Sequence, residues 1–87
     1  MLTQRPPYVL SAPGGILSGR PQGEALLAQV TDVLRQGVPD SVTPVDFAAV
    51  SFIDISCADE FYTKLLLRIG SGELGSRYVV AIGVNAS

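Results

Sequence analysis

The chain has 87 residues, of which 47% are hydrophobic and 16% are charged, and its formal net charge at pH 7 is −2. A negative charge without a cluster of Lys and Arg argues against nucleic acid as a partner. One cysteine and no histidine exclude an internal disulfide, a Cys/His zinc site and any Ser–His or Cys–His catalytic dyad. We therefore expect one domain over residues 1–87, non-enzymatic and without cofactor or metal.

The N-terminal region predicts an arm followed by a hairpin. Residues 1–7 are expected to form a loose arm, because two consecutive prolines disfavour helix and central strand. Short strands are predicted at residues 8–10 and 16–17. The turn residues at 12–15, Ala-Pro-Gly-Gly, indicate that these two strands pair as a hairpin.

A first helix is predicted from Pro21, a favourable residue for a first helical turn, to about Gln36. A polar loop then leads to a central strand at residues 44–48, where apolar residues flank Asp46. The apolar residues of the helix recur at helical spacing on one face, which indicates that this face covers a core. They are Leu26, Leu27, Val30, Val33 and Leu34.

A second helix is predicted over residues 57–69, ending at Gly70, and a last strand over residues 78–84. The strand, YVVAIGV, has the composition of a strand buried on both faces of a parallel sheet. The element order is β-β-α-β-α-β, which predicts an α/β fold with a mixed sheet and the helices as its outer layer. The apolar stripe of the second helix contains Ala58, Phe61, Tyr62, Leu65, Leu66 and Ile69.

Only three residues follow the last strand, so the fold is expected to be C-terminally short. Without a further helix, this strand leaves an apolar edge open to water. We therefore expect self-association through residues 78–84, or cover supplied by a longer native protein. The mean hydropathy of +0.36 also indicates that part of the apolar surface meets a partner or another segment.

The turn before the second helix has the most distinctive chemistry. Ser56 is predicted to cap this helix by accepting from the backbone N–H of Asp59, and Asp59 and Glu60 favour the positive end of the helix dipole. A structural cap is one interpretation of Ser56, and a regulatory hydroxyl is the other. The candidate contact surface around Ser56 consists of Asp54, Ile55, Cys57, Asp59 and Glu60.

Other motifs have simpler interpretations. Residues 70–75 match G-x-G-x-x-G, but they follow a helix and precede a strand, the reverse of a dinucleotide site. Residues 14–19 lack the Lys and Ser/Thr of a phosphate loop. Asp59 and Glu60 diverge by about 100° on a helix, so capping and solvation explain them better than a Mg²⁺ site or a carboxylate pair. Cys57 is interpreted as a small buried residue, because nearby carboxylates disfavour a thiolate.

The central stretch resembles the STAS family, the fold of sulphate transporters and anti-sigma-factor antagonists. In that family a strand ends in Asp, an apolar stretch leads to a second Asp, and a Ser two residues later opens a helix. Gly15-Ile16-Leu17 resembles the start of the family's second strand, and the resemblance extends from about residue 8 to residue 84. The residues at matching positions are Asp46, Val50, Phe52, Ile53, Asp54 and Ser56.

Two positions depart from the common pattern of the family. Ile55 stands where many members have Ser, and Cys57 stands where many have Gly. The run from Ser56 to Phe61 is closer to a divergent STAS-like subfamily with an Ala-Asp-Glu helix start.

This resemblance implies a non-enzymatic regulatory switch of the anti-sigma-factor-antagonist type. It implies that Ser56 accepts a phosphate from a kinase of the GHKL ATP-binding type, and that such an ATPase or an anti-sigma factor is the protein partner. A phosphate adds a charge of about −1.5 to −2. Beside Asp54, Asp59 and Glu60, this charge is expected to break a contact surface.

The alternative is an accessory domain of a larger bacterial signalling or transport protein that senses a small ligand or a nucleotide at the same helix start. No signal-peptide pattern opens the chain, and no apolar run approaches the roughly 18 residues of a membrane span. We therefore expect no membrane insertion and a cytoplasmic location.

Overall fold

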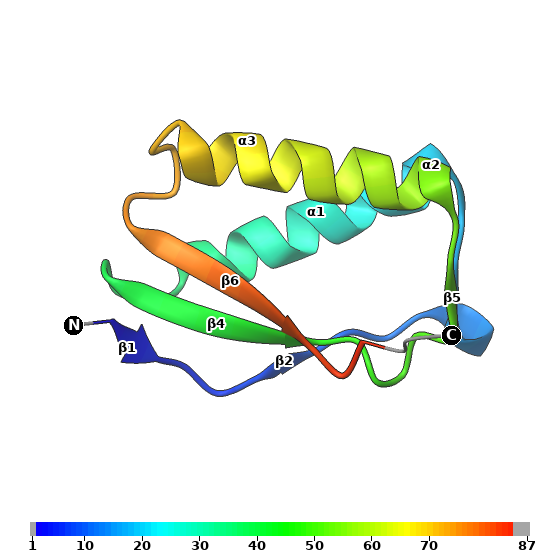
Figure 1. Cartoon of the computed structure of the whole chain (residues 1–87), viewed down its shortest axis with the longest axis horizontal. Coiled ribbons are helices and arrows are strands. Elements are labelled where there is room, and N and C mark those ends of the chain that lie inside the picture. The colour runs from blue at the N-terminus through cyan, green and yellow to red at the C-terminus, as the bar shows by residue number, and fades with distance from the viewer. Residues whose placement is uncertain (1, 85–87) are drawn as a thin grey trace.

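The computed structural model describes residues 2–84 as two layers, with the helices packed on one face of a sheet (Figure 1). The main sheet contains β1 (Thr3–Gln4), β2 (Tyr8–Val9), β4 (Ser41–Asp46) and β6 (Arg77–Ile82). A short 3₁₀ turn over 13–15 precedes β3 (Ile16–Leu17), which pairs with β5 (Phe52–Ile53). The helices are α1 (Gly19–Arg35) and a continuous second helix formed by α2 (Ile55–Ala58), the π-helical turn η2 (Asp59–Thr63) and α3 (Lys64–Gly70).

Every strand pairing in the described residues is parallel, so the expectation of a mixed sheet is wrong. β4 is central: β1 and β2 pair in succession along one of its edges, and β6 pairs along the other. The predicted hairpin is also wrong, since β3 pairs with β5 and not with β2. Gly14 and Gly15, at φ of 62° and 74°, turn the chain away from β2 before β3 begins.

The N-terminal arm is more ordered than expected. Thr3 donates its backbone N–H to the carbonyl of Asp40 at 2.8 Å, and Arg5 donates to that of Val42 at 2.9 Å. The Arg5 guanidinium also donates to the carbonyl of Val33 at 2.6 Å. The expectation of a loose arm is therefore wrong for these residues. The two prolines separate β1 from β2, but both short strands pair with β4.

The core lies between the helices and β4. The predicted apolar face of α1 is confirmed, since four of its five residues are buried (Leu26, Leu27, Val30 and Leu34). The stripe of the second helix is narrower than predicted: Phe61 and Leu65 are buried, but Leu66 is 63% exposed. The last strand is not buried on both faces, because most of β6 is exposed. The α/β class is confirmed, with helices on one face only in the part of the chain described here (Figure 1).

Among residues 2–84, no helix combines the length and apolar character needed to cross a membrane.

Candidate interaction site

Asp54, and not Ser56, caps the second helix. The Asp54 carboxylate accepts a hydrogen bond from the backbone N–H of Cys57 at 2.8 Å. The N–H of Asp59 donates to the carbonyls of Ile55 and Ser56, so the predicted bond to the Ser56 hydroxyl is absent. The physical reason is that Asp54 is the last extended residue, and its own N–H is held by the carbonyl of Leu17 at 3.1 Å at the end of the β3–β5 pair.

The Asp54 carboxylate also joins the two helices. Its two oxygens accept from the backbone N–H of Gly19, the first residue of α1, at 3.1 and 3.0 Å. One side chain thus satisfies an amide at the start of each helix, where backbone N–H groups have no partner within the helix. The N-termini of α1 and α2 are held side by side as a result.

Ser56 lies in the first turn of α2 and is exposed. The residues beside it are apolar and also exposed: Ile55 has 87% of its surface open to solvent, and Phe52 has 55%. Residues 52–56 line a shallow depression. The structure therefore presents a serine within an apolar surface, and we call residues 52–56 the contact turn.

Two residues expected on this surface are buried instead. Cys57 has 0% of its surface exposed, which confirms its interpretation as a buried residue, and Glu60 has 5%. Both lie where the second helix crosses α1 at Gly23, where an added Cβ would stand 2.7 Å from the carbonyl oxygen of Cys57. Burial raises the pKa of the Cys57 thiol, and the Asp54 carboxylate raises it further. Cys57 and Glu60 cannot contribute a partner-facing side chain while this crossing is intact.

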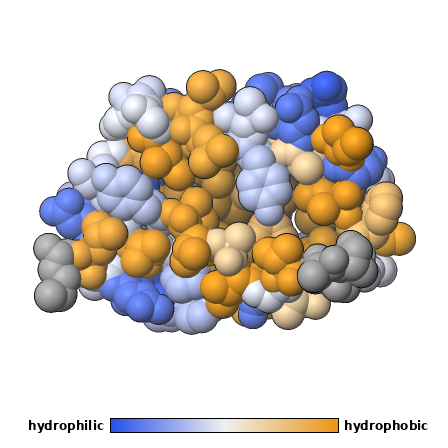
Figure 2. Space-filling view, viewed as in Figure 1, coloured by the Kyte–Doolittle hydropathy of each residue, from blue (hydrophilic) through white to orange (hydrophobic). Residues whose placement is uncertain are grey.

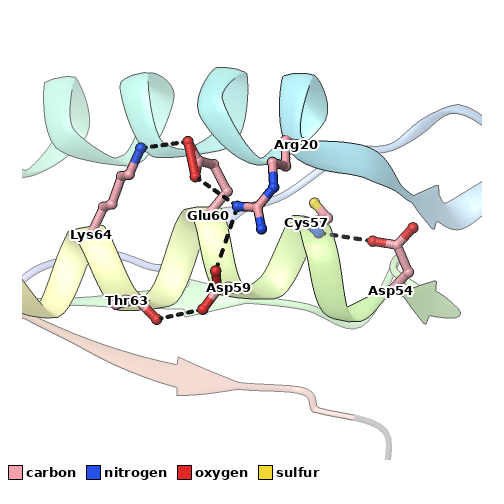
Figure 3. Close-up of polar contacts among 7 residues, drawn as sticks. All are labelled: Arg20, Asp54, Cys57, Asp59, Glu60, Thr63 and Lys64. Carbon is pink, nitrogen blue, oxygen red and sulfur yellow. Dashed lines mark hydrogen bonds and ion pairs between the residues drawn. The ribbon is translucent and has the colours of Figure 1, made fainter.

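Glu60 is held by cations from both helices (Figure 3). Lys64 donates to its Oε1 at 2.5 Å, and an Arg20 nitrogen on α1 stands 3.4 Å from its Oε2. The hydrogen bond from Lys64, assisted by Arg20, keeps the pKa of Glu60 below its ordinary value despite burial. The expectation that solvation accounts for Glu60 is wrong, because it is a buried, paired carboxylate.

Asp59 remains at the surface, with 54% of its side chain exposed. Its Oδ2 lies 3.5 Å from the same Arg20 nitrogen, and its Oδ1 accepts from the Thr63 hydroxyl at 3.2 Å (Figure 3). Arg20 therefore bridges two acidic side chains of the second helix.

A second apolar surface lies between β6 and the second helix, and we call it the β6 groove. A cavity of about 170 Å³ lies there, lined by Val79 and Ala81 of β6 and by Tyr62 and Leu66 of the helix. A neighbouring cavity of about 280 Å³ shares Phe47 and Tyr62 with it and is also lined by Phe52 and Ile53 of the contact turn. Tyr62 stacks on Phe47 with ring centroids 6.1 Å apart, and burial raises the pKa of its hydroxyl. Figure 2 shows hydrophobic residues gathered over this side of the molecule. Leu66 is exposed at this groove. Tyr78, Val80 and Ile82 alternate along β6 with the groove-lining Val79 and Ala81, so they are exposed on the opposite face of the strand.

Sequence reasoning missed Arg20 and undervalued Phe52. A cation in the first turn of a helix is unfavourable, because it lies at the positive end of the helix dipole. The position of Arg20 in the sequence therefore indicated that a carboxylate from another element pairs with it. Phe52 belongs to the apolar stretch of the STAS-like motif, yet its side chain is more than half exposed. Alternation along β5 did not reveal this, since the strand has only two residues.

Comparison of the chain with protein-family models, with curated proteins and with solved structures finds no match. The resemblance to STAS domains therefore remains a prediction from a short motif. In the described part of the chain, no group of three or more His, Cys, Asp or Glu side chains is arranged to hold a metal ion.

Proposed function

We propose that this domain is a non-enzymatic protein-binding switch whose partner contacts the contact turn. The observation that carries the proposal is Ile55, which exposes 87% of its surface beside the exposed Ser56. A large apolar side chain at a turn costs free energy when it remains hydrated, and a protein partner recovers that free energy by covering it. Phe52 enlarges the same apolar surface.

The backbone of the contact turn is fixed before any partner arrives. Asp54 makes hydrogen bonds to Leu17, Gly19 and Cys57, and its carbonyl accepts from Ala58 at 2.9 Å. Little conformational entropy remains to be lost on binding, so the free energy of apolar contact is retained as affinity.

Ser56 is the proposed regulatory residue, as in the anti-sigma-factor-antagonist type that the chain resembles. Because Asp54 provides the cap, the Ser56 hydroxyl is not needed for capping. A GHKL-type kinase would transfer the γ-phosphoryl group of ATP to the Ser56 oxygen, with release of ADP and the hydroxyl proton. The new charge, beside Asp54 and Asp59, would make an apolar contact unfavourable. An ATP-dependent switch also suits the expected cytoplasmic location.

The alternative, a sensor of a nucleotide or small anion at the same helix start, has less support. The Asp54 carboxylate already accepts from Gly19 and Cys57, amides that an anionic ligand would use. Its negative charge also opposes a second anion.

The free edge of β6 and its exposed apolar side chains support a second proposal, self-association through residues 78–84. In the described residues the outer edge of β6 pairs with no strand, and over Arg77–Ile82 it carries no Lys, Pro or bulge that would protect it. A two-fold axis would pair two β6 strands antiparallel and cover Tyr78, Val80 and Ile82 of both copies. Light scattering at micromolar concentration tests this association: a clean monomer would contradict it.

Phosphorylation of the purified chain by a GHKL-type ATPase from the same source tests the proposed switch. We expect one phosphate, mapped by mass spectrometry to Ser56 and absent from Ser56→Ala. Ser71, also exposed, is the internal control. Phosphate on Ser71, or equal labelling of Ser56→Ala, would contradict the assignment of Ser56.

A further inference from the structure

Arg20 is a cation shared between two carboxylates that hold it weakly. Its nearest nitrogen is 3.5 Å from Asp59 and 3.4 Å from Glu60, both longer than usual for a charge-assisted hydrogen bond, and 60% of its side chain is exposed. Both acids keep another partner if Arg20 leaves: Lys64 for Glu60 and Thr63 for Asp59. The guanidinium can therefore move without leaving a buried charge unpaired.

Arg20 also lies close to the start of the second helix. Asp59 and Glu60 follow Ser56 by three and four residues, so all three lie on one side of the helix, with neighbouring Cβ atoms about 5–6 Å apart. Helical side chains lean toward the N-terminus, which brings the two carboxylates back toward Ser56. From the other side, the residue preceding Arg20 is bound to Asp54, two residues before Ser56. Both constraints place Arg20 over the side of the second helix that carries Ser56.

Resting on the proposed function, we propose that Arg20 is the intramolecular receptor of a phosphate on Ser56. The guanidinium moves from Asp59 and Glu60 to the phosphate, where two of its N–H groups bond two phosphate oxygens. A phosphate carries more charge than a carboxylate and matches the planar fork of Arg, so the exchange is favourable.

The movement of the Arg20 guanidinium determines where negative charge appears after phosphorylation. The phosphate is drawn onto the seam between α1 and α2, while Asp59 loses its cation and becomes a freely negative group beside the contact turn. The fold is retained because Lys64 remains on Glu60. Arg20 is thus a positioning residue that sets where the new charge lies.

The test is a ³¹P NMR pH titration of the chain with phosphoserine incorporated at position 56 during synthesis. A free phosphoserine loses its second proton at a pKa of about 6. Contact with Arg20 should place this pKa below 6, and Arg20→Gln should raise it by about one unit. The matched control is Arg35→Gln at the other end of α1, where Arg35 is similarly exposed and stands 4.0 Å from Glu73. This variant should leave the phosphate pKa unchanged.

A second measurement needs no substitution. The side-chain N–H signals of Arg20, and not those of Arg35, should shift with the phosphate titration. Equal phosphate pKa values in Arg20→Gln and Arg35→Gln, or a pKa above 6 in the parent chain, would overturn the proposal.

These outcomes are separable from the proposed function. If the phosphate weakens partner binding but its pKa is unchanged in Arg20→Gln, the proposed switch stands and the assignment of Arg20 as receptor is wrong. If the pKa responds to Arg20 but partner binding is unchanged, the receptor stands and the switch is wrong.

Discussion

The helix crossing at Gly23 buries polar groups, whereas the β6 groove leaves an apolar side chain exposed. At the crossing a carboxylate and a thiol are buried, and an added methyl at Gly23 would meet the backbone of Cys57 and the Cβ of Glu60. At the groove, Leu66 is exposed and a cavity of about 170 Å³ remains open. The crossing is thus an interface closed within the chain, while the groove is an apolar surface that the described residues leave open.

The contact turn lies between these two regions and shares a property with each. Its backbone is fixed by Asp54, as at the crossing, and its side chains Phe52 and Ile55 are exposed, as at the groove. Substitutions at the crossing should therefore change stability, while those on the exposed side of β6 should change association.

Gly23→Ala should have the largest effect on stability. The new Cβ would stand 2.7 Å from the carbonyl oxygen of Cys57 and 2.8 Å from the Cβ of Glu60, so the helices must separate. We expect a loss of about 1–3 kcal/mol in the free energy of unfolding, measured by urea denaturation. Gly70→Ala is the matched control, because its Cβ would meet nothing within 4 Å. Equal effects of the two would show that the crossing is not tightly packed.

Asp54→Ala should come next, with a loss of about 1–2 kcal/mol from the missing helix cap. The further loss of the bond to Gly19 places the effect toward the upper end of this range. Ser56→Ala should change stability by less than about 0.5 kcal/mol, as is usual for surface substitutions. If Ser56→Ala lowered the free energy of unfolding as much as Asp54→Ala, the Ser56 hydroxyl would be the helix cap.

Glu60 should make the crossing sensitive to acid. Its pKa is lowered in the folded state by Lys64 and Arg20, so its contribution to stability is complete above the unfolded pKa of about 4.3 and is lost as the pH falls through the folded value. Glu60→Gln should flatten the fall of the urea midpoint between about pH 5 and pH 3. Glu73→Gln, at an exposed pair, is the control. If both variants follow the parent chain, the ion pairs of Glu60 add nothing to stability.

Val80→Lys should have the smallest effect on stability and a clear effect on association. Val80 is already 46% exposed, so the free energy of unfolding should change by less than about 0.5 kcal/mol. A lysine on an edge strand opposes pairing with a second copy. Light scattering should show a monomer for Val80→Lys and association for the parent and for Ala28→Lys, an exposed control on α1. Association retained in Val80→Lys would exclude the β6 edge.

The two helices and the central strand were predictable because their signals are local. The spacing of Leu26, Leu27, Val30 and Leu34 indicated the buried face of α1. The alternation around Asp46 indicated the central strand, predicted over residues 44–48 and observed over Ser41–Asp46. Strand partners were not predictable in this way. The pairing of β3 with β5 joins residues far apart in sequence, whereas the turn residues at 12–15 suggested a local hairpin.

The cap of the second helix was predicted two residues too late, on Ser56 and not on Asp54. Asp54 and Ser56 both have side chains that favour N-cap positions, and the sequence does not say where the extended backbone ends. The end of the extended backbone is set by tertiary structure, through the hydrogen bond from the Asp54 N–H to the carbonyl of Leu17. Glu60 was misjudged for a similar reason: charged residues are rarely buried unless paired, and its partner Arg20 lies on another helix.

The central claim is that the contact turn binds a protein and that a phosphate on Ser56 releases it. Calorimetric titration of the GHKL-type ATPase with four chains tests this claim most directly: unmodified, phosphorylated on Ser56, Ile55→Asp, and the control Val38→Asp, at an exposed apolar residue outside the contact turn. We predict equal affinity for the unmodified chain and Val38→Asp, and at least about tenfold weaker binding, or about 1.4 kcal/mol, for the other two. Equal affinity of all four chains would contradict the claim.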